Sequence, residues 1–125
     1  MSSLVSLFLD HVADEPDRPA LHVKRSGEFQ PVTWSELARE VRQTAAALRR
    51  LGVAPGDRVV QVSENRYEWI VTDLAVLMAR GVHVAIHATL SGPQIAYQIN
   101  DCEPRVIIVS TQAQADKLAG ERLPR

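Results

Sequence analysis

The sequence is short of cysteine, of long apolar runs and of one-sided charge, and each shortage argues against a class of protein. The one cysteine, Cys102, cannot form an internal disulfide, which agrees with a reducing, cytoplasmic location. No stretch reaches the roughly 18 uninterrupted apolar residues that a membrane helix requires, so no transmembrane segment is expected and only peripheral membrane association stays open. The 14 basic and 15 acidic residues nearly cancel, and no basic block is interleaved with aromatic residues, so nucleic acid is not an expected partner.

The amino terminus also lacks the pattern of a secretion signal. An apolar run within residues 1–10 has no Lys or Arg before it, and the acidic Asp14 and Glu15 follow it closely, so no signal peptide is expected. Hydrophobic residues at 46% and charged residues at 23% are typical of a soluble globular chain. The 125 residues are predicted to form a single domain, because a chain of this size can bury a sizeable core.

Motifs for phosphate binding, hydrolysis and zinc are missing. The six glycines are scattered and none stands in the frame of a phosphate-binding loop, and the sequence has no G-x-S-x-G, H-E-x-x-H or C-x-x-C motif. His83 and His87 stand four residues apart in a predicted strand, so their imidazoles project to the same side, which would allow them to share a metal ion. We interpret them as polar positions of a strand that meets solvent or a polar contact. No catalytic and no metal-binding residue is therefore assigned.

The other two histidines and the cysteine are interpreted without a catalytic or metal-binding role. His11 and His22 have no carboxylate or cysteine partner nearby in the sequence and are interpreted as surface residues. Cys102 stands between Asp101 and Glu103, whose negative charges disfavour a thiolate. It is therefore interpreted as a structural or exposed thiol.

The first part of the sequence predicts a helix and then a β-hairpin. Apolar residues recur at helical spacing from Leu4 to Val12 and stop before the proline-rich turn at 16–19. Two short extended runs, 20–24 and 29–33, meet around Gly27, which is typical of a hairpin. Thr33 and Glu36 then form a capping box that begins a helix, and Gly52 stands where a left-handed cap would end it.

The rest of the chain alternates strands and helices. Runs rich in β-branched residues at 57–63, 82–86 and 105–109 predict three strands, and the first of them is typical of a strand covered on both faces. Asn65 with Glu68, and Ser91 with Gln94, predict the starts of two helices, and residues 112–119 predict a last one. This order favours a parallel sheet. The predicted fold class is α/β: an N-terminal helix and hairpin, then a parallel sheet with covering helices and an edge left open for more chain.

Four runs of sequence, in this order, resemble the N-terminal domain of adenylate-forming ligases. They are VTWSEL at 32–37, LGVAPGDRV at 51–59, ENRYEW at 64–69 and ATLS at 88–91. The third and fourth runs look more like long-chain fatty acid CoA ligases, that is, fatty acyl-CoA synthetases, than like peptide-synthetase adenylation domains or luciferases. The resemblance implies that residues 1–125 are an incomplete part of an AMP-binding (adenylation) domain.

Ligases of this family join a carboxylate, here a fatty acid, to AMP from ATP and Mg²⁺ and then pass the acyl group to CoA. The family's phosphate-gripping loop, adenine motif, ribose-binding Asp and C-terminal catalytic Lys would all follow Arg125. The resemblance therefore implies that this segment is scaffold, inactive alone and without a cofactor of its own, and that the rest of the ligase chain covers its open sheet. Acyl chain length is not expected to be readable here, because later residues build most of the acyl pocket.

The resemblance offers one binding residue. In relatives the segment 87–89 lies near the nucleotide end of CoA, which makes Thr89 the candidate for a cofactor contact. The alternative is a loop whose Ser91 merely caps the next helix. Two other functions stay open: a truncated, non-catalytic paralogue that acts as an interaction module, and a generic flavodoxin-like domain. The latter would need ligand groups at the carboxyl ends of the strands, where the sequence shows no acidic cluster.

Overall fold

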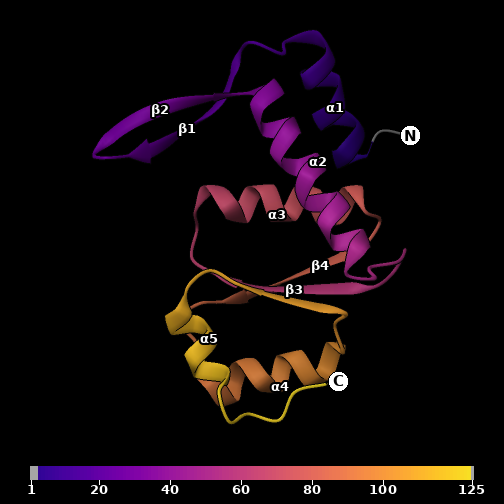
Figure 1. The fold of residues 1–125 in the computed structure, drawn as a ribbon, viewed down its shortest axis with the longest axis vertical. Coiled ribbons are helices and arrows are strands. Elements are labelled where there is room, and N and C mark those ends of the chain that lie inside the picture. Colours follow the sequence, from indigo (N-terminus) through magenta and orange to yellow (C-terminus); the bar gives the residue numbers. More distant parts are fainter. Residues whose placement is uncertain (1–2, 125) are drawn as a thin grey trace.

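A computed structural model describes residues 3–124 and shows the expected α/β fold (Figure 1). The first half contains α1 (Leu4–Asp14), the strands β1 (Pro19–Arg25) and β2 (Glu28–Thr33), and α2 (Trp34–Arg50). The second half contains β3 (Arg58–Ser63), α3 (Tyr67–Met78), β4 (Val82–His87), α4 (Gly92–Cys102), β5 (Val106–Val109) and α5 (Gln112–Leu118). The described part of the chain has no helix long and apolar enough to cross a membrane.

The strands β3, β4 and β5 form a parallel sheet in the order β4-β3-β5. The central strand, β3, is buried from its second residue onward because α2 and α3 lie over one face of the sheet and α4 over the other (Figure 1). Alternate residues of a strand point to opposite faces. Val59 accordingly packs in the cluster with α2 and α3, whereas Val60 and Val62 pack with α4. The prediction of a strand covered on both faces is confirmed.

Helix α2 begins and ends as its sequence predicts. The Glu36 amide donates to Thr33 Oγ1 at 3.1 Å, and the Thr33 amide donates to Glu36 Oε1 at 3.2 Å, so the capping box is complete. At the other end Gly52 has a φ of 96°, a conformation that glycine adopts without strain. This turn lets the Val53 amide donate to the Leu48 carbonyl at 3.1 Å and close the helix.

The predicted start of α3 is wrong by one residue. Asn65 does not cap the helix; Arg66 takes the cap position in an extended conformation and makes no side-chain cap bond. Glu68 is therefore the second helical residue rather than the third. The Trp69 amide donates to the Arg66 carbonyl at 3.0 Å, which places the first turn one residue later than predicted.

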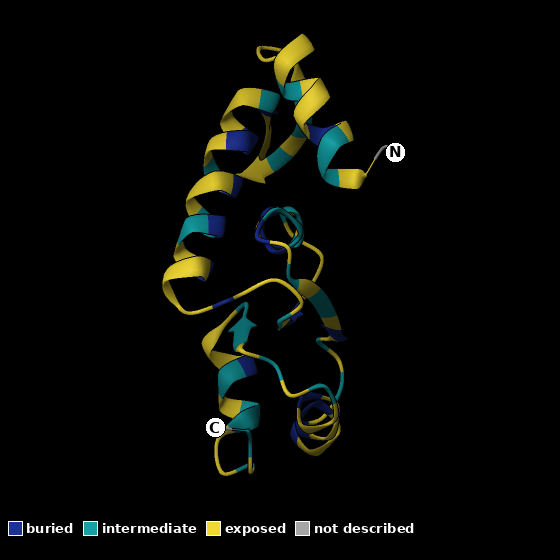
Figure 2. Ribbon diagram, turned by 90° about the vertical axis from the view of Figure 1, so that its right-hand side faces the viewer, coloured by how far each residue is buried: buried dark blue, intermediate teal, exposed yellow. Residues whose placement is uncertain are grey.

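The hairpin and α1 cover only part of the core. β1 and β2 pair in antiparallel fashion, and their turn has a positive φ at both Ser26 and Gly27, as a tight two-residue hairpin requires. Within β2 only Val32 is buried, and within α1 only Phe8, whose ring lies 6.1 Å from that of Trp34. Figure 2 shows that most of α1 is exposed.

Candidate functional site

The three parallel strands end at the same edge of the sheet, and polar side chains gather there. In open α/β sheets ligands bind beyond this edge. Glu64 directly follows β3, the loop 88–91 follows β4, and Ser110 follows β5. Together with Gln114 and Lys117 of α5 they form a group that we call the carboxyl-edge cluster.

Glu64 lies at the centre of the carboxyl-edge cluster. The Ser110 hydroxyl donates to Glu64 Oε2 at 2.6 Å, and the side-chain Nε2 of Gln114 donates to Glu64 Oε1 at 2.9 Å. These hydrogen bonds favour the charged carboxylate and lower the pKa of Glu64 to about 2. Glu64 is therefore an anion at neutral pH, and it joins the end of β3 to the end of β5.

Gln114 and Lys117 join α5 to the loop after β4. The Gln114 amide nitrogen also donates to the Ala88 carbonyl at 3.2 Å. The Lys117 ammonium donates to the Ala88 carbonyl at 2.6 Å and to the Leu90 carbonyl at 3.1 Å. The Gln114 side chain is buried, and within residues 3–124 its Oε1 has no hydrogen-bond partner. The cluster thus joins α5 to the loop through the Ala88 and Leu90 carbonyls.

The same region contains a close approach between two backbones. A Cβ atom built on Gly92, the first residue of α4, would lie 2.2 Å from the Lys117 carbonyl oxygen. Real Cβ atoms essentially never come within 3.0 Å of another heavy atom, so only glycine fits here. The start of α4 and the end of α5 are therefore packed against each other directly.

The loop 88–91 has an exposed Thr89 and an ordered exit into α4. The Leu90 amide donates to the His87 carbonyl at 3.2 Å, which closes a turn around Thr89. The Ser91 hydroxyl accepts from the backbone amide of Gln94 at 3.4 Å, and the backbone amide of Ser91 donates to Gln94 Oε1 at 2.9 Å. The capping role of Ser91 is confirmed. A ligand contact of Thr89 stays a prediction.

His83 and His87 have different surroundings. The His83 side chain is 7% exposed; its Nδ1 lies 2.9 Å from Asp73 Oδ1 and its Nε2 lies 2.8 Å from Gln61 Oε1. The Trp69 ring meets the imidazole edge-on at 5.2 Å. Burial lowers the pKa of His83, and the Asp73 charge opposes this shift. His87 is exposed, and the described residues contain no group of three or more side chains placed to hold a metal ion.

The interpretation of His11 needs one correction. Its Nδ1 lies 3.7 Å from Glu15 Oε2, and its ring stacks on Trp34 at 4.7 Å. Residues four apart on a helix are neighbours, so Glu15 is the carboxylate partner that the sequence interpretation overlooked. His22 is exposed, as expected. Cys102 is partly buried, and burial raises the pKa of its thiol.

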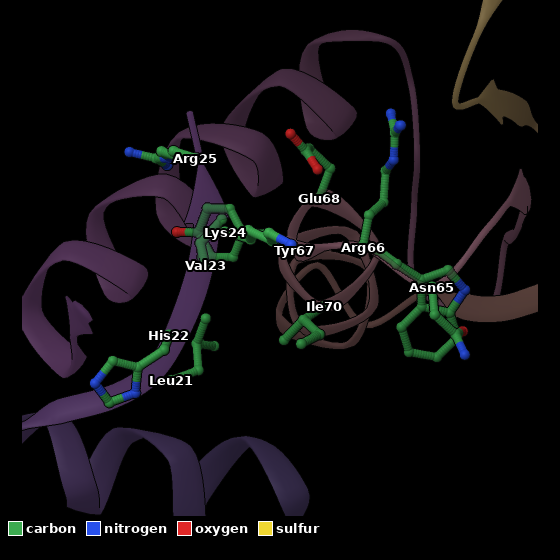
Figure 3. A pocket seen from close by; sticks show the side chains of 11 residues that line it. Leu21, His22, Val23, Lys24, Arg25, Asn65, Arg66, Tyr67, Glu68 and Ile70 are labelled. Carbon is green, nitrogen blue, oxygen red and sulfur yellow. The ribbon is translucent and has the colours of Figure 1, made fainter. Parts of the chain in front are cut away.

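A cleft lies elsewhere, between the hairpin and the first turn of α3. This cleft has a volume of about 820 Å³, and its rim carries the cations Lys24, Arg25 and Arg66 (Figure 3). All three are exposed. Tyr67 is the partly buried polar group here; burial and a hydrogen bond with Glu40 raise its pKa. Within residues 3–124 the buried side-chain polar atom without a hydrogen-bond partner is Gln114 Oε1, at the carboxyl edge, so we take the carboxyl-edge cluster as the candidate site.

Four side chains of the carboxyl-edge cluster were not predicted from the sequence: Glu64, Ser110, Gln114 and Lys117. For Glu64 and Ser110 a signal existed, because each is a polar residue that directly follows a predicted strand of a parallel sheet. Gln114 and Lys117 gave no such signal, since the Ala88 carbonyl that both bind is 26 and 29 residues away in the sequence.

The chain has relatives among known proteins. The family model described as "AMP-binding enzyme" matches residues 8–124. The long-chain-fatty-acid–CoA ligase FadD15 of Mycobacterium bovis is 34% identical over 117 residues, which are 94% of this chain and 20% of that protein. The uncharacterized protein Rv1549 of Mycobacterium tuberculosis is 30% identical over 110 residues, which are 88% of this chain and 61% of that protein. The chain thus spans about a fifth of the length of FadD15.

Solved structures share the fold. The N-terminal domain of FACL13 from Mycobacterium tuberculosis superposes with a TM-score of 0.88 at 20% sequence identity. The superposition covers 99% of this chain and 32% of that domain. The arrangement of helix, hairpin and parallel sheet is therefore found within a larger domain.

Proposed function

Because this chain belongs to the AMP-binding enzyme family, we propose that it is the scaffold segment of a ligase that activates a long-chain fatty acid with ATP and transfers the acyl group to CoA. One observation carries the proposal: the family match spans residues 8–124. The 34% identity to FadD15 over 117 residues supports it. The four ordered runs of sequence between 32 and 91 support the same assignment.

The residues that hold ATP and Mg²⁺ lie outside this segment in our proposal. A pentavalent phosphorus and its pyrophosphate leaving group are stabilised by hydrogen-bond donors and a metal ion. The sequence has no phosphate-binding loop, and residues 3–124 have no cluster of ligands suited to a metal. We therefore expect no acyl-adenylate from the segment alone. Its contribution is the sheet and helices on which the rest of the ligase chain packs.

Thr89 is the proposed contact with the nucleotide end of CoA. Its side chain is exposed at the carboxyl edge of the sheet, where ligands of α/β proteins bind. The carbonyls of its neighbours Ala88 and Leu90 are bound by Lys117, so the loop offers the hydroxyl from a fixed backbone. A hydroxyl can both donate and accept a hydrogen bond, which suits a ribose or phosphate group.

A second candidate function is a non-catalytic interaction module. It is favoured by the similarity to Rv1549, in which the aligned region makes up 61% of the protein rather than a fifth. In the described sheet β4 and β5 pair with β3 only, and such strand edges can pair with another chain. In this case the carboxyl-edge cluster would serve structure alone.

An activity assay distinguishes the two. The 125-residue chain and the whole reading frame that contains it would each be purified and incubated with palmitate, ATP, Mg²⁺ and CoA, with a control that lacks ATP. We expect palmitoyl-CoA from the whole frame and none from the 125-residue chain. Turnover by the 125-residue chain would refute the scaffold role. A frame that stops after codon 125, together with a specific complex with a ligase, would favour the interaction module.

A further inference from the structure

The Lys117 ammonium binds two carbonyls on either side of one residue. Its partners are the Ala88 oxygen at 2.6 Å and the Leu90 oxygen at 3.1 Å, and Thr89 lies between them. The two bound carbonyls belong to the peptide groups that enter Thr89 and leave Leu90. One cation therefore restricts the backbone on both sides of the Thr89 side chain.

The side chain of Lys117 starts from a backbone that cannot easily move. Its carbonyl oxygen packs on Gly92 so closely that a Cβ atom there would lie at 2.2 Å. One turn earlier on α5, Gln114 is buried and binds the same Ala88 carbonyl at 3.2 Å. Because α5 is held at both points, the Lys117 side chain reaches the loop from a fixed base.

Both hydrogen-bond partners of the Lys117 ammonium are main-chain carbonyls. Hydrogen bonds from a charged donor are stronger than neutral ones and cost more to lose. Lys117 itself is only partly buried, and Thr89 beside it is exposed. The bonds thus stabilise a loop at the protein surface, where a ligand would meet it.

We propose that Lys117 is a positioning residue, whose bonds to the Ala88 and Leu90 carbonyls hold Thr89 in the orientation that binds the ligand. The part of this proposal that concerns CoA rests on the proposed function. The part that concerns the loop does not, and the two are tested separately.

Amide hydrogen exchange of the 125-residue chain, followed by NMR, tests the hold on the loop. The reporter is the Leu90 amide, which is hydrogen-bonded to the His87 carbonyl. Lys117→Met keeps the length of the side chain and removes the ammonium, so Leu90 exchange should rise about tenfold or more, the factor expected for one charged hydrogen bond. Exchange of Val60, in the buried central strand, should stay unchanged.

Two variants serve as controls. Lys117→Arg retains a charged donor and should restore most of the Leu90 protection. Lys24→Met removes the only other lysine of the chain, whose ammonium lies 5.9 Å from the Phe29 ring on the hairpin, and should leave Leu90 unchanged. Unchanged Leu90 exchange in Lys117→Met would overturn the proposal. An equal rise at Leu90 and Val60 would also overturn it, because the effect would then be a general loss of stability.

A titration with CoA tests the ligand. In the whole reading frame that contains this chain, the Thr89 amide resonance of the wild type should shift on addition of millimolar CoA. Lys117→Met should weaken this response several-fold, and Lys117→Arg should restore it. If Leu90 exchange depends on Lys117 but CoA leaves Thr89 unshifted in the wild type, the CoA contact is refuted and the hold on the loop is supported. If CoA binds equally to the wild type and Lys117→Met, the positioning role is refuted.

Discussion

Replacing Gly92 by alanine tests the packing on which the carboxyl-edge cluster depends. The added Cβ would lie 2.2 Å from the Lys117 carbonyl oxygen and 3.2 Å from its carbon. Since the nearest acceptable approach is 3.0 Å, α4 and α5 must separate by most of an ångström. The atoms in the way belong to the backbone, so no change of side-chain rotamer relieves the contact.

The size of the effect follows from two opposing terms. Alanine is favoured over glycine by up to about 1 kcal/mol inside a helix, and by less at a first helical position such as that of Gly92. Forcing a methyl group into a packed contact costs about 1–3 kcal/mol. We therefore expect Gly92→Ala to lower the free energy of unfolding by about 1–2 kcal/mol, and the displaced α5 to loosen the Lys117 bonds as well.

Urea unfolding followed by circular dichroism measures this difference, and Gly81→Ala is the matched control. A Cβ on Gly81 would meet the Asp57 carbonyl oxygen at 3.1 Å, and neither glycine has the left-handed backbone that alone would disfavour alanine. The loss should therefore be clearly smaller at Gly81 than at Gly92. A Gly92→Ala variant as stable as the wild type would show that the two helices are not in backbone contact.

Three further predictions concern other parts of the fold. Thr33→Ala removes the capping box of α2 and should lower the free energy of unfolding in urea by about 0.5–2 kcal/mol, whereas Thr33→Ser should lose little; equal losses would contradict the cap. The pKa of Glu64 is about 2 in the fold and 4.5 ordinarily, so its stabilising contribution is complete above pH 4.5 and disappears as the pH falls towards 2. Thermal unfolding of Glu64→Gln should depend less on pH over that range, and identical slopes would refute the Glu64 hydrogen bonds. The pKa of His83 is lowered from 6.5, so the unfolded chain binds that proton more readily and stability should fall as the pH drops below 6.5. His83→Gln should remove this part of the pH dependence, as thermal melts at about pH 7.5 and 5.5 would show.

Features that depend on neighbouring residues were predictable from the sequence. The capping boxes of Thr33 and Ser91 need a partner three residues away, and both are confirmed. The predicted start of α3 was wrong because the chain before this helix is held by residues far away in the sequence. The chain before it is anchored by Glu64, whose partners Ser110 and Gln114 are 46 and 50 residues away. The side chains near Asn65 in the sequence do not indicate those contacts.

The parallel sheet was also predictable from local patterns, whereas the contact between Asp73 and His83 was not. β-branched runs and the order of elements were enough to predict the parallel sheet, and with it the edge where the strands end. They did not show that Asp73, the one charge within the apolar part of α3, would meet His83 of β4. That pair forms only because α3 packs on the sheet with this face inward, which depends on the whole core rather than on local sequence.

Two polar networks result, one enclosed around His83 and one at the carboxyl edge with exposed members, and this difference identifies the one suited to function. Buried polar groups nearly always have hydrogen-bond partners, and a missing partner costs roughly 1–3 kcal/mol. Around His83 the side chain is enclosed, and its ring nitrogens lie 2.9 Å from Asp73 Oδ1 and 2.8 Å from Gln61 Oε1. A neutral imidazole has one N–H and donates to one of these oxygens. Such an enclosed group suits a structural role. In the carboxyl-edge cluster the buried Gln114 Oε1 has no partner among residues 3–124, and Glu64 and Thr89 remain exposed. Exposed polar groups at the edge where α/β sheets bind ligands favour the carboxyl edge as the candidate site.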